Sequence, residues 1–137
     1  MKIITIKEYY TSDLCRKHPD KLFIFGDNLD RYGKKGQAII RDEPNTFGIA
    51  TKVEPTMKKS AFFDDAPSCF QVVDEDIDRM FELAKDKGFK FIVVPWEGIG
   101  TGLAKLREKA PKLLRHIHYR LELCGKDGKR IKLPTKI

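Results

Sequence analysis

The chain has 137 residues, of which 41% are hydrophobic, and a formal net charge of +7. This length and composition fit a single domain over residues 1–137 with its own core, and they exclude a disordered chain. No apolar run approaches the roughly 20 residues of a membrane span, so we expect no membrane partner.

The cysteines and the N-terminus favour a cytoplasmic protein. Residues 1–6 alternate like a strand and lack the pattern of a signal peptide. The three cysteines, Cys15, Cys69 and Cys124, are isolated and do not have the spacing of metal ligands. We therefore predict reduced thiols, and we assign no metal ion and no cofactor.

The first half of the chain predicts three strands and two short helices. The strands are expected over residues 2–10, 22–25 and 47–52, and the helices over residues 11–17 and 37–41. Residues 53–69 have no regular pattern.

The second half predicts further strands and two longer helices. Asp74 is the expected N-cap of a helix that ends at Gly88, and Pro111 is expected to divide a helix over residues 103–124. Strands are expected over residues 70–73, 89–95 and 130–133. Because strands alternate with helices, the pattern predicts an α/β sandwich with a mixed sheet that is parallel in part.

Residues 94–103 stand out as a candidate phosphate-binding loop. They follow an apolar run, and Gly98, Gly100 and Gly102 occupy alternate positions before an expected helix. Glycine permits sharp turns and a close approach of the backbone to a ligand, and helix N-termini favour phosphate.

Two other polar motifs follow predicted strands, at Gly26-Asp27-Asn28 and at Thr51-Lys52. In parallel sheets, ligands bind at the carboxyl ends of the strands, so the three motifs together predict a pocket at that edge. Asp27 and Asn28 could instead close a local turn. Lys52 could pair with phosphate, act as a nucleophile if it is desolvated, or extend its ammonium group into solvent.

The segment between these motifs is also open to two interpretations. Gly33, Gly36 and Gln37 lie in a lysine-containing glycine-rich loop that could surround a ribose or a pyrophosphate, or form a mobile surface loop. Arg41 could bind a phosphate with a fork of donors, or form a surface ion pair.

Taken together, the motifs at residues 25–28, 33–38, 49–52 and 95–104 resemble the macrodomain family of ADP-ribose-binding modules. The chain looks most similar to the branch that contains the terminal ADP-ribose protein glycohydrolase, and to small uncharacterised macrodomain-like proteins of phages and bacteria. The resemblance implies a three-layer α/β/α sandwich and an ADP-ribose ligand.

The resemblance also implies roles for individual residues. Asp27 would lie near the adenine amine, Gly33, Gly36 and Gln37 would line the distal ribose, and Lys52 would match the covalent nucleophile. Residues 98–103 would surround the diphosphate. The resulting ligand-binding set is Asp27, Asn28, Gly33, Gly36, Gln37, Arg41, Gly98, Ile99, Gly100, Thr101, Gly102 and Leu103.

One position departs from the glycohydrolase branch. That branch has an acidic residue after the Gly-x-Gly-Leu segment, where this chain has Ala104. Glu97 and Asp64 are the acids that could replace it, and we name them with Lys52 as candidate catalytic residues. The resemblance therefore implies ligand binding by this chain more directly than it implies hydrolysis.

Three functions remain open at this stage. The first is binding of ADP-ribose or a related NAD-derived nucleotide. Such a protein could remove ADP-ribose from a target, or it could sequester or degrade a nucleotide signal. The second is nucleic-acid binding through residues 105–136, because 11 basic and 3 acidic residues follow residue 100. The third is a phage-encoded inhibitor that acts by protein–protein contact.

Overall fold

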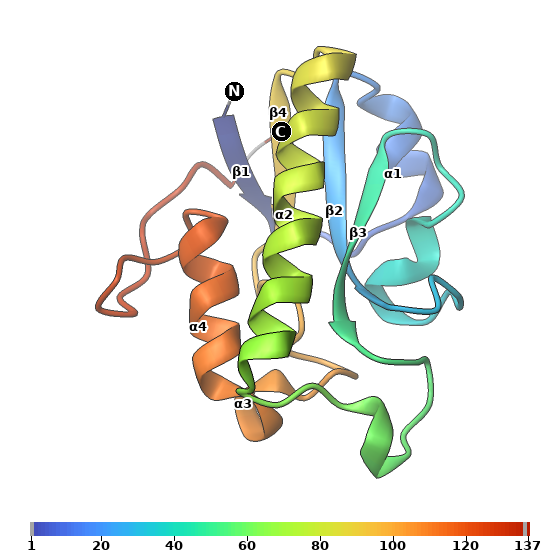
Figure 1. The fold of residues 1–137 in the computed structure, drawn as a ribbon. Coiled ribbons are helices and arrows are strands. Elements are labelled where there is room, and N and C mark those ends of the chain that lie inside the picture. The colour runs from blue at the N-terminus through green and yellow to red at the C-terminus, as the bar shows by residue number, and fades with distance from the viewer. Residues whose placement is uncertain (1, 136) are drawn as a thin grey trace.

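A four-stranded parallel sheet forms the centre of the molecule. The computed structural model describes residues 2–135 and residue 137. The strands are β1 (Lys2–Ile6), β2 (Lys21–Asn28), β3 (Thr46–Lys52) and β4 (Phe91–Pro95), in the order β1-β4-β2-β3 (Figure 1). All three strand pairs are parallel. The expectation of a mixed sheet is therefore wrong, because the segments predicted as strands at 70–73 and 130–133 do not join it.

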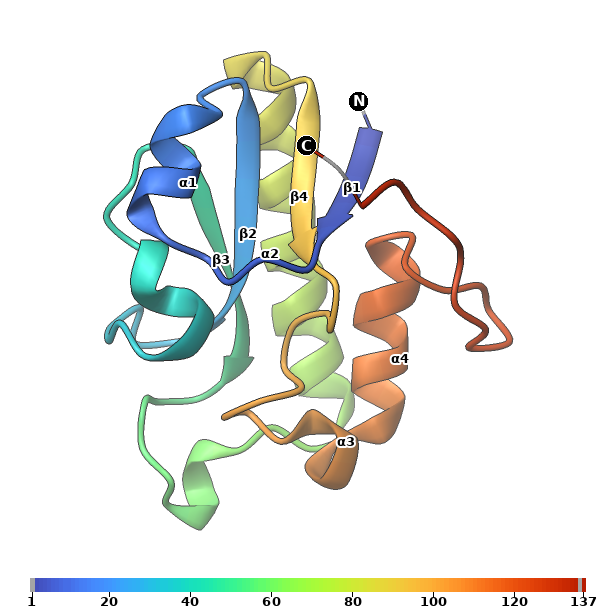
Figure 2. The ribbon, with the colours of Figure 1, turned by 180° about the vertical axis from the view of Figure 1, so that it is seen from behind.

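Helices cover both faces of the sheet, which explains the continuous apolar runs of its central strands. In β2, Leu22 and Ile24 belong to the core under α2 (Pro67–Lys87) and α4 (Pro111–Arg120). Phe23 and Phe25 point to the opposite core, which is covered by α1 (Ser12–Lys17) and the 3-10 helix η1 (Gly36–Ile40) (Figures 1 and 2).

Helix α2 differs most from the prediction. It begins at Pro67, with Ala66 as N-cap, so neither the strand at 70–73 nor an N-cap at Asp74 is correct. Val73 and Ile77 are fully buried on the face that packs against the sheet, and this tertiary packing overrides the strand preference of the Phe-Gln-Val-Val run. The expected end is confirmed, because Gly88 adopts the left-handed conformation with φ of 72°.

The chain after β4 is less regular than predicted. Pro111 separates α3 (Leu106–Lys109) from α4, as expected, but α4 ends at Arg120 rather than near residue 124. Beyond it, an isolated antiparallel bridge between Cys124 and Arg130 takes the place of the expected strand. No described helix is long and apolar enough to cross a membrane.

The parallel strands place their carboxyl ends at one edge of the sheet. The loops after β2, β3 and β4 all leave from this edge, which also lies beside α3 (Figure 1). The loop after β3 contains the 3-10 helix η2 (Lys59–Ala61). The three motifs predicted to converge therefore do so.

Candidate functional site

Residues 96–105, the glycine loop, connect β4 to the single turn of α3. Gly98 and Gly100 have φ angles of 85° and 81°, in the left-handed region that glycine adopts without strain. The loop expected between the strand and a helix is therefore present, but the helix that follows it is the single turn of α3 rather than the start of a long helix. Lys105 ends the loop with a φ of 50°, which is uncommon for a residue with a side chain.

The backbone of the glycine loop has unused donors. Leu106 donates its N–H to the carbonyl of Gly100, and Lys105 donates to Gly102. Within the described part of the chain, the N–H groups of residues 99–104 donate no hydrogen bond. A run of free N–H groups in a loop that contains left-handed glycines is typical of an anion-binding backbone.

Gly26 near the end of β2 lies beside this loop, among polar atoms. A Cβ atom at Gly26 would lie 3.4 Å from the Gly100 nitrogen, 3.5 Å from Thr51 Oγ1 and 3.7 Å from Gln37 Oε1. Polar atoms of the glycine loop, of β3 and of η1 therefore meet beside Gly26.

Gln37 ties the two predicted ligand loops together. Its Oε1 accepts a hydrogen bond from the Gly26 N–H at 3.0 Å, and its Nε2 donates to the Gly98 carbonyl at 2.9 Å. Nε2 also lies 3.4 Å from Glu97 Oε1. Gln37 is therefore structural at the base of the site, whereas the predicted role was ribose contact.

The two glycines of the preceding loop lie close to the other loops of this edge. A Cβ on Gly36 would lie 3.9 Å from Leu103, and one on Gly33 would lie 3.7 Å from Pro55. Both glycines have positive φ angles, 61° and 101° respectively. The structure thus brings the loops after β2, β3 and β4 together at one place.

The interior side of the glycine loop packs tightly on α3 and α4. A Cβ on Gly98 would lie 2.3 Å from His118 Nε2, and a Cβ on Gly100 would lie 2.3 Å from Leu106 Cδ1. His118 Nε2 is buried and has no hydrogen-bond partner among the described residues. Burial lowers the pKa of His118 to about 4, and the nearby charges of Arg130 and Arg107 also lower it. His118 is therefore neutral near pH 7.

Asp27 and Arg41, which were both predicted to bind ligand, bind each other. Arg41 contacts the two Asp27 oxygens at 2.5 and 3.0 Å, and its Nε donates to the Gly33 carbonyl. The Asp27 side chain is only 3% exposed. Arg41 therefore forms an ion pair, but with the buried Asp27 rather than at the surface as expected.

Asn28 fixes the turn that follows β2. Its Nδ2 donates to the Tyr32 carbonyl at 2.8 Å, while its buried Oδ1 has no partner in the described structure. The local-turn interpretation therefore explains the Nδ2 group of Asn28, whereas the Oδ1 atom is left as an unused acceptor.

Lys52 lies at the carboxyl end of β3, as predicted, with little exposure to solvent. Its Nζ donates to the Thr56 carbonyl at 2.5 Å and lies 4.8 Å from the centre of the Phe62 ring. Burial lowers the pKa of Lys52 below its ordinary value; Glu54 opposes this effect and Lys105 adds to it. A less basic amine is a better nucleophile at neutral pH.

The two candidate acids differ in position. Glu97 is exposed beside Gln37 and the glycine loop. Asp64 instead accepts the N–H of Ala66 at 2.9 Å at the start of α2. Ala104 is 5% exposed and belongs to the core, so its position faces the interior. Of the two acids, only Glu97 contacts a residue of the predicted ligand loops.

Sequence reasoning missed Arg31 and Asp76, which link the loop after β2 to α2. Arg31 contacts both oxygens of Asp76 at 2.7 Å and donates to the Gly48 carbonyl at 2.9 Å. Asp76 also accepts the Ala50 N–H at 2.7 Å. The pair therefore satisfies polar groups on the free edge of β3, where a further strand could otherwise add.

A signal for Asp76 is present in the sequence. It lies on the same helical stripe as Val73, Ile77 and Met80, all of which are fully buried. A carboxylate on an apolar stripe needs a charged partner, because burial of an unpaired charge is costly. Within the described residues, no group of three or more His, Cys, Asp or Glu side chains is placed to hold a metal ion.

One family of proteins matches most of the chain. A model for a family of unknown function, DUF7831, matches residues 5–120, which include β2, β3 and β4 in full and the last two residues of β1. No curated protein and no solved structure matches the chain significantly. Because the family match covers well over half of the 137 residues, the chain belongs to the family of unknown function DUF7831.

Proposed function

We propose that this chain binds ADP-ribose or a related NAD-derived nucleotide at the glycine loop, as a macrodomain-like α/β/α module. The observation that carries the proposal is the run of free N–H groups over residues 99–104, which lies beside Gly26 at the carboxyl edge of the sheet. Backbone donors of this kind bind the oxygens of a diphosphate.

The surrounding groups support an anionic ligand with a sugar. Lys52 and Lys105 lie close enough for the charge of Lys105 to affect the pKa of Lys52. Glu97 and the Gly33–Gly36 segment lie beside the loop and offer acceptors for ribose hydroxyls. Cationic groups together with hydrogen-bond acceptors favour a nucleoside diphosphate sugar as the ligand over inorganic phosphate alone.

Calorimetric titration with ADP-ribose, ADP and NAD tests the binding proposal. Gly102 is a clean position for a variant, because a Cβ there meets nothing within 4 Å. We expect Gly102→Glu to weaken ADP-ribose binding at least about tenfold through repulsion of the diphosphate. Gly102→Ala is the matched control and should bind like the wild type. Absence of heat with all three ligands at millimolar concentration would overturn the proposal.

The same site suggests how removal of ADP-ribose would proceed. Lys52 would attack the anomeric carbon as a neutral amine and break its bond to the target, and Glu97 would give a proton to the departing target group, because Ala104 carries no acid. Water would then cleave the bond between Lys52 and the anomeric carbon, which releases ADP-ribose and restores the free amine. Incubation with ADP-ribosylated protein or DNA tests this chemistry. Lys52→Ala should abolish release of ADP-ribose, and Glu97→Gln should slow it. Equal release by the wild type and Lys52→Ala would exclude the covalent route.

Nucleic-acid binding through residues 105–136 is the second candidate, although Lys136 lies outside the described residues. Three arginines of this segment already have intramolecular partners: Arg115 at Lys126, Arg120 at Asp74 and Asp78, and Arg130 at the Trp96 carbonyl. The exposed lysines remain available. Affinity for duplex DNA would then fall by about 0.9 log units per log unit of salt for each phosphate neutralised.

An inhibitor that acts by protein–protein contact is the third candidate. Capture of the same partner by the wild type and by Gly102→Glu would favour this function, because such contact does not need the glycine loop.

A further inference from the structure

A second group of cations lies at the free edge of β3, outside the glycine loop. Three arginines, Arg31, Arg41 and Arg79, and two aspartates, Asp27 and Asp76, line a surface pocket of about 450 Å³. The walls between them come from Phe25 and from residues 46–48. The three cations and two anions leave one net positive charge.

The aspartates hold the arginines in fixed orientations. Asp27 and Asp76 are 3% and 1% exposed at their side chains, and each contacts an arginine through both oxygens. Arg41 also lies with its guanidinium carbon 5.4 Å from the centre of the Phe25 ring. Buried carboxylates that fix guanidinium groups in place form the support that a preorganised anion site needs.

The arginines retain donors that the aspartates do not use. Arg79 contacts Asp76 through Nη2 alone at 2.6 Å, and its side chain is 60% exposed. Among the described residues, its Nε and Nη1 and the Nε of Arg31 have no acceptor. A planar guanidinium with a free edge matches two oxygens of a phosphate.

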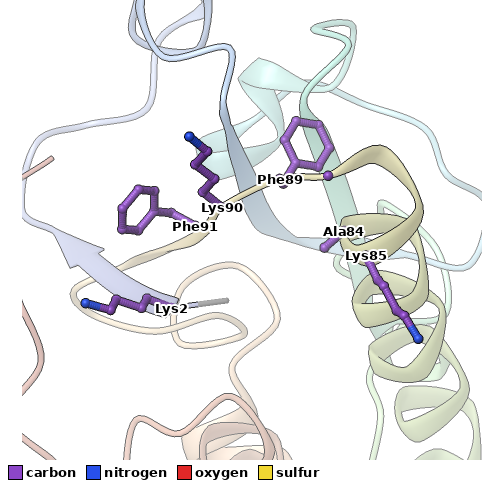
Figure 3. Close-up of a pocket in the computed structure, with 7 residues that line it drawn as sticks. Lys2, Ala84, Lys85, Phe89, Lys90 and Phe91 are labelled. Atoms are coloured by element: carbon purple, nitrogen blue, oxygen red, sulfur yellow. The ribbon is translucent and has the colours of Figure 1, made fainter.

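Another pocket of the molecule lacks this arrangement. The pocket of about 510 Å³ at the opposite edge of the sheet is lined by Lys2, Lys85 and Lys90. Figure 3 shows these lysines pointing in different directions, away from a common centre. Lysine is a mobile point charge without a fixed fork of donors, so we place no ligand there.

Buried ion pairs give little net stability, so stability alone does not account for three arginines on two buried aspartates. We propose that the pocket formed by Arg31, Arg41 and Arg79 binds a phosphate group. The group is either an additional phosphate of the nucleotide at the glycine loop or a separate phosphate ion. Arg79 is the contact from α2 and the one with the most unused donors.

The test begins with the full chain and inorganic phosphate, at constant ionic strength. Phosphate binding should raise the midpoint of thermal unfolding of the wild type in a concentration-dependent manner. Arg79→Gln should remove this increase, because it deletes the exposed cation and keeps a side chain of similar length. Lys85→Gln, on the same helix but at the other pocket, is the matched control and should keep it.

A second titration identifies the source of the phosphate. The ligands are ADP-ribose and its analogue with a phosphate on the 2′-hydroxyl of the adenosine ribose. If the group belongs to the nucleotide, the analogue binds about tenfold more tightly, and Arg79→Gln removes the difference. If the phosphate is separate, the two nucleotides bind equally and inorganic phosphate still protects the wild type.

Two results would show that the arginine pocket does not bind phosphate. Phosphate is added to about 20 mM, which exceeds a dissociation constant in the millimolar range. If this concentration does not raise the midpoint of thermal unfolding, and the two nucleotides bind equally, the pocket does not bind phosphate. The same conclusion follows if Arg79→Gln keeps both effects. Gly102→Glu separates this outcome from failure of the proposed function, because phosphate should still protect that variant when the glycine loop is blocked.

Discussion

Asp76 of α2 contacts Arg31 of the loop after β2 through both carboxylate oxygens at 2.7 Å, across 45 positions of sequence. The same carboxylate accepts the Ala50 N–H of β3, and Arg79 binds it from the solvent side. One buried side chain thus joins a helix, the edge strand and a loop of the candidate site.

Asp76→Asn should destabilise the protein by about 2 to 3 kcal/mol, because it removes the negative charge between Arg31 and Arg79. Urea denaturation measures the change in the free energy of unfolding. Asp78→Asn is the matched control, since Asp78 is 69% exposed on the same helix, and it should change stability by less than about 0.5 kcal/mol. Equal effects of the two variants would contradict a structural role for Asp76.

Gly100→Ala should be more harmful than Gly102→Ala. At Gly100 the new Cβ would lie 2.3 Å from Leu106 Cδ1 on a backbone with φ of 81°, so both packing and conformation oppose it. We expect a loss of at least about 2 kcal/mol for Gly100→Ala and a change near zero for Gly102→Ala. Thermal unfolding of the two variants checks the difference, and a stable Gly100→Ala would show that the loop can move away from α3.

His118 should make the stability depend on pH. Its pKa is lowered by burial to about 4 in the folded protein, from 6.5 as its ordinary value. The unfolded chain therefore binds the proton more readily, and stability should fall as the pH decreases from about 6.5 to about 4, by at most about 3 kcal/mol. Below pH 4 this contribution should change no further.

Urea denaturation of wild type and His118→Leu across this range isolates the effect of His118. The leucine variant should lose that part of the pH dependence, whereas His18→Gln, at a residue outside the site, should keep it. An unchanged profile in His118→Leu would mean that other groups cause the acid destabilisation.

Asp65→Ala should destabilise the protein by about 1 kcal/mol through loss of a helix cap. Asp65 lies before α2, but its Oδ1 accepts the Leu113 N–H at 2.8 Å in the first turn of α4. Asp65→Asn should retain most of the stability, because asparagine also caps helices. Asp42→Ala, at a side chain that is 70% exposed, serves as the control for loss of a surface charge. A fully stable Asp65→Ala would show that α4 does not need this contact.

Where the sequence was sufficient, the deciding interaction was local. A helix was expected over residues 11–17, and α1 begins there with Thr11 as its N-cap, whose hydroxyl accepts the Leu14 N–H at 3.1 Å. Gly88 was expected to end α2 and does so in the left-handed conformation. Where the sequence misled, the deciding contact was distant in sequence, as for Phe70, which lies in α2 and packs against the core rather than in a strand.

The sequence by itself determined the buried strands, the end of α2, the break at Pro111 and the position of the glycine loop. These features follow from apolar runs and from the backbone limits of glycine and proline, which act within a few residues. Only the tertiary structure decided that the sheet is wholly parallel, that Gln37 supports the glycine loop, and that Asp27 binds Arg41. The reason is physical: a buried polar or charged group must find a partner, and that partner comes from whichever element the fold brings beside it.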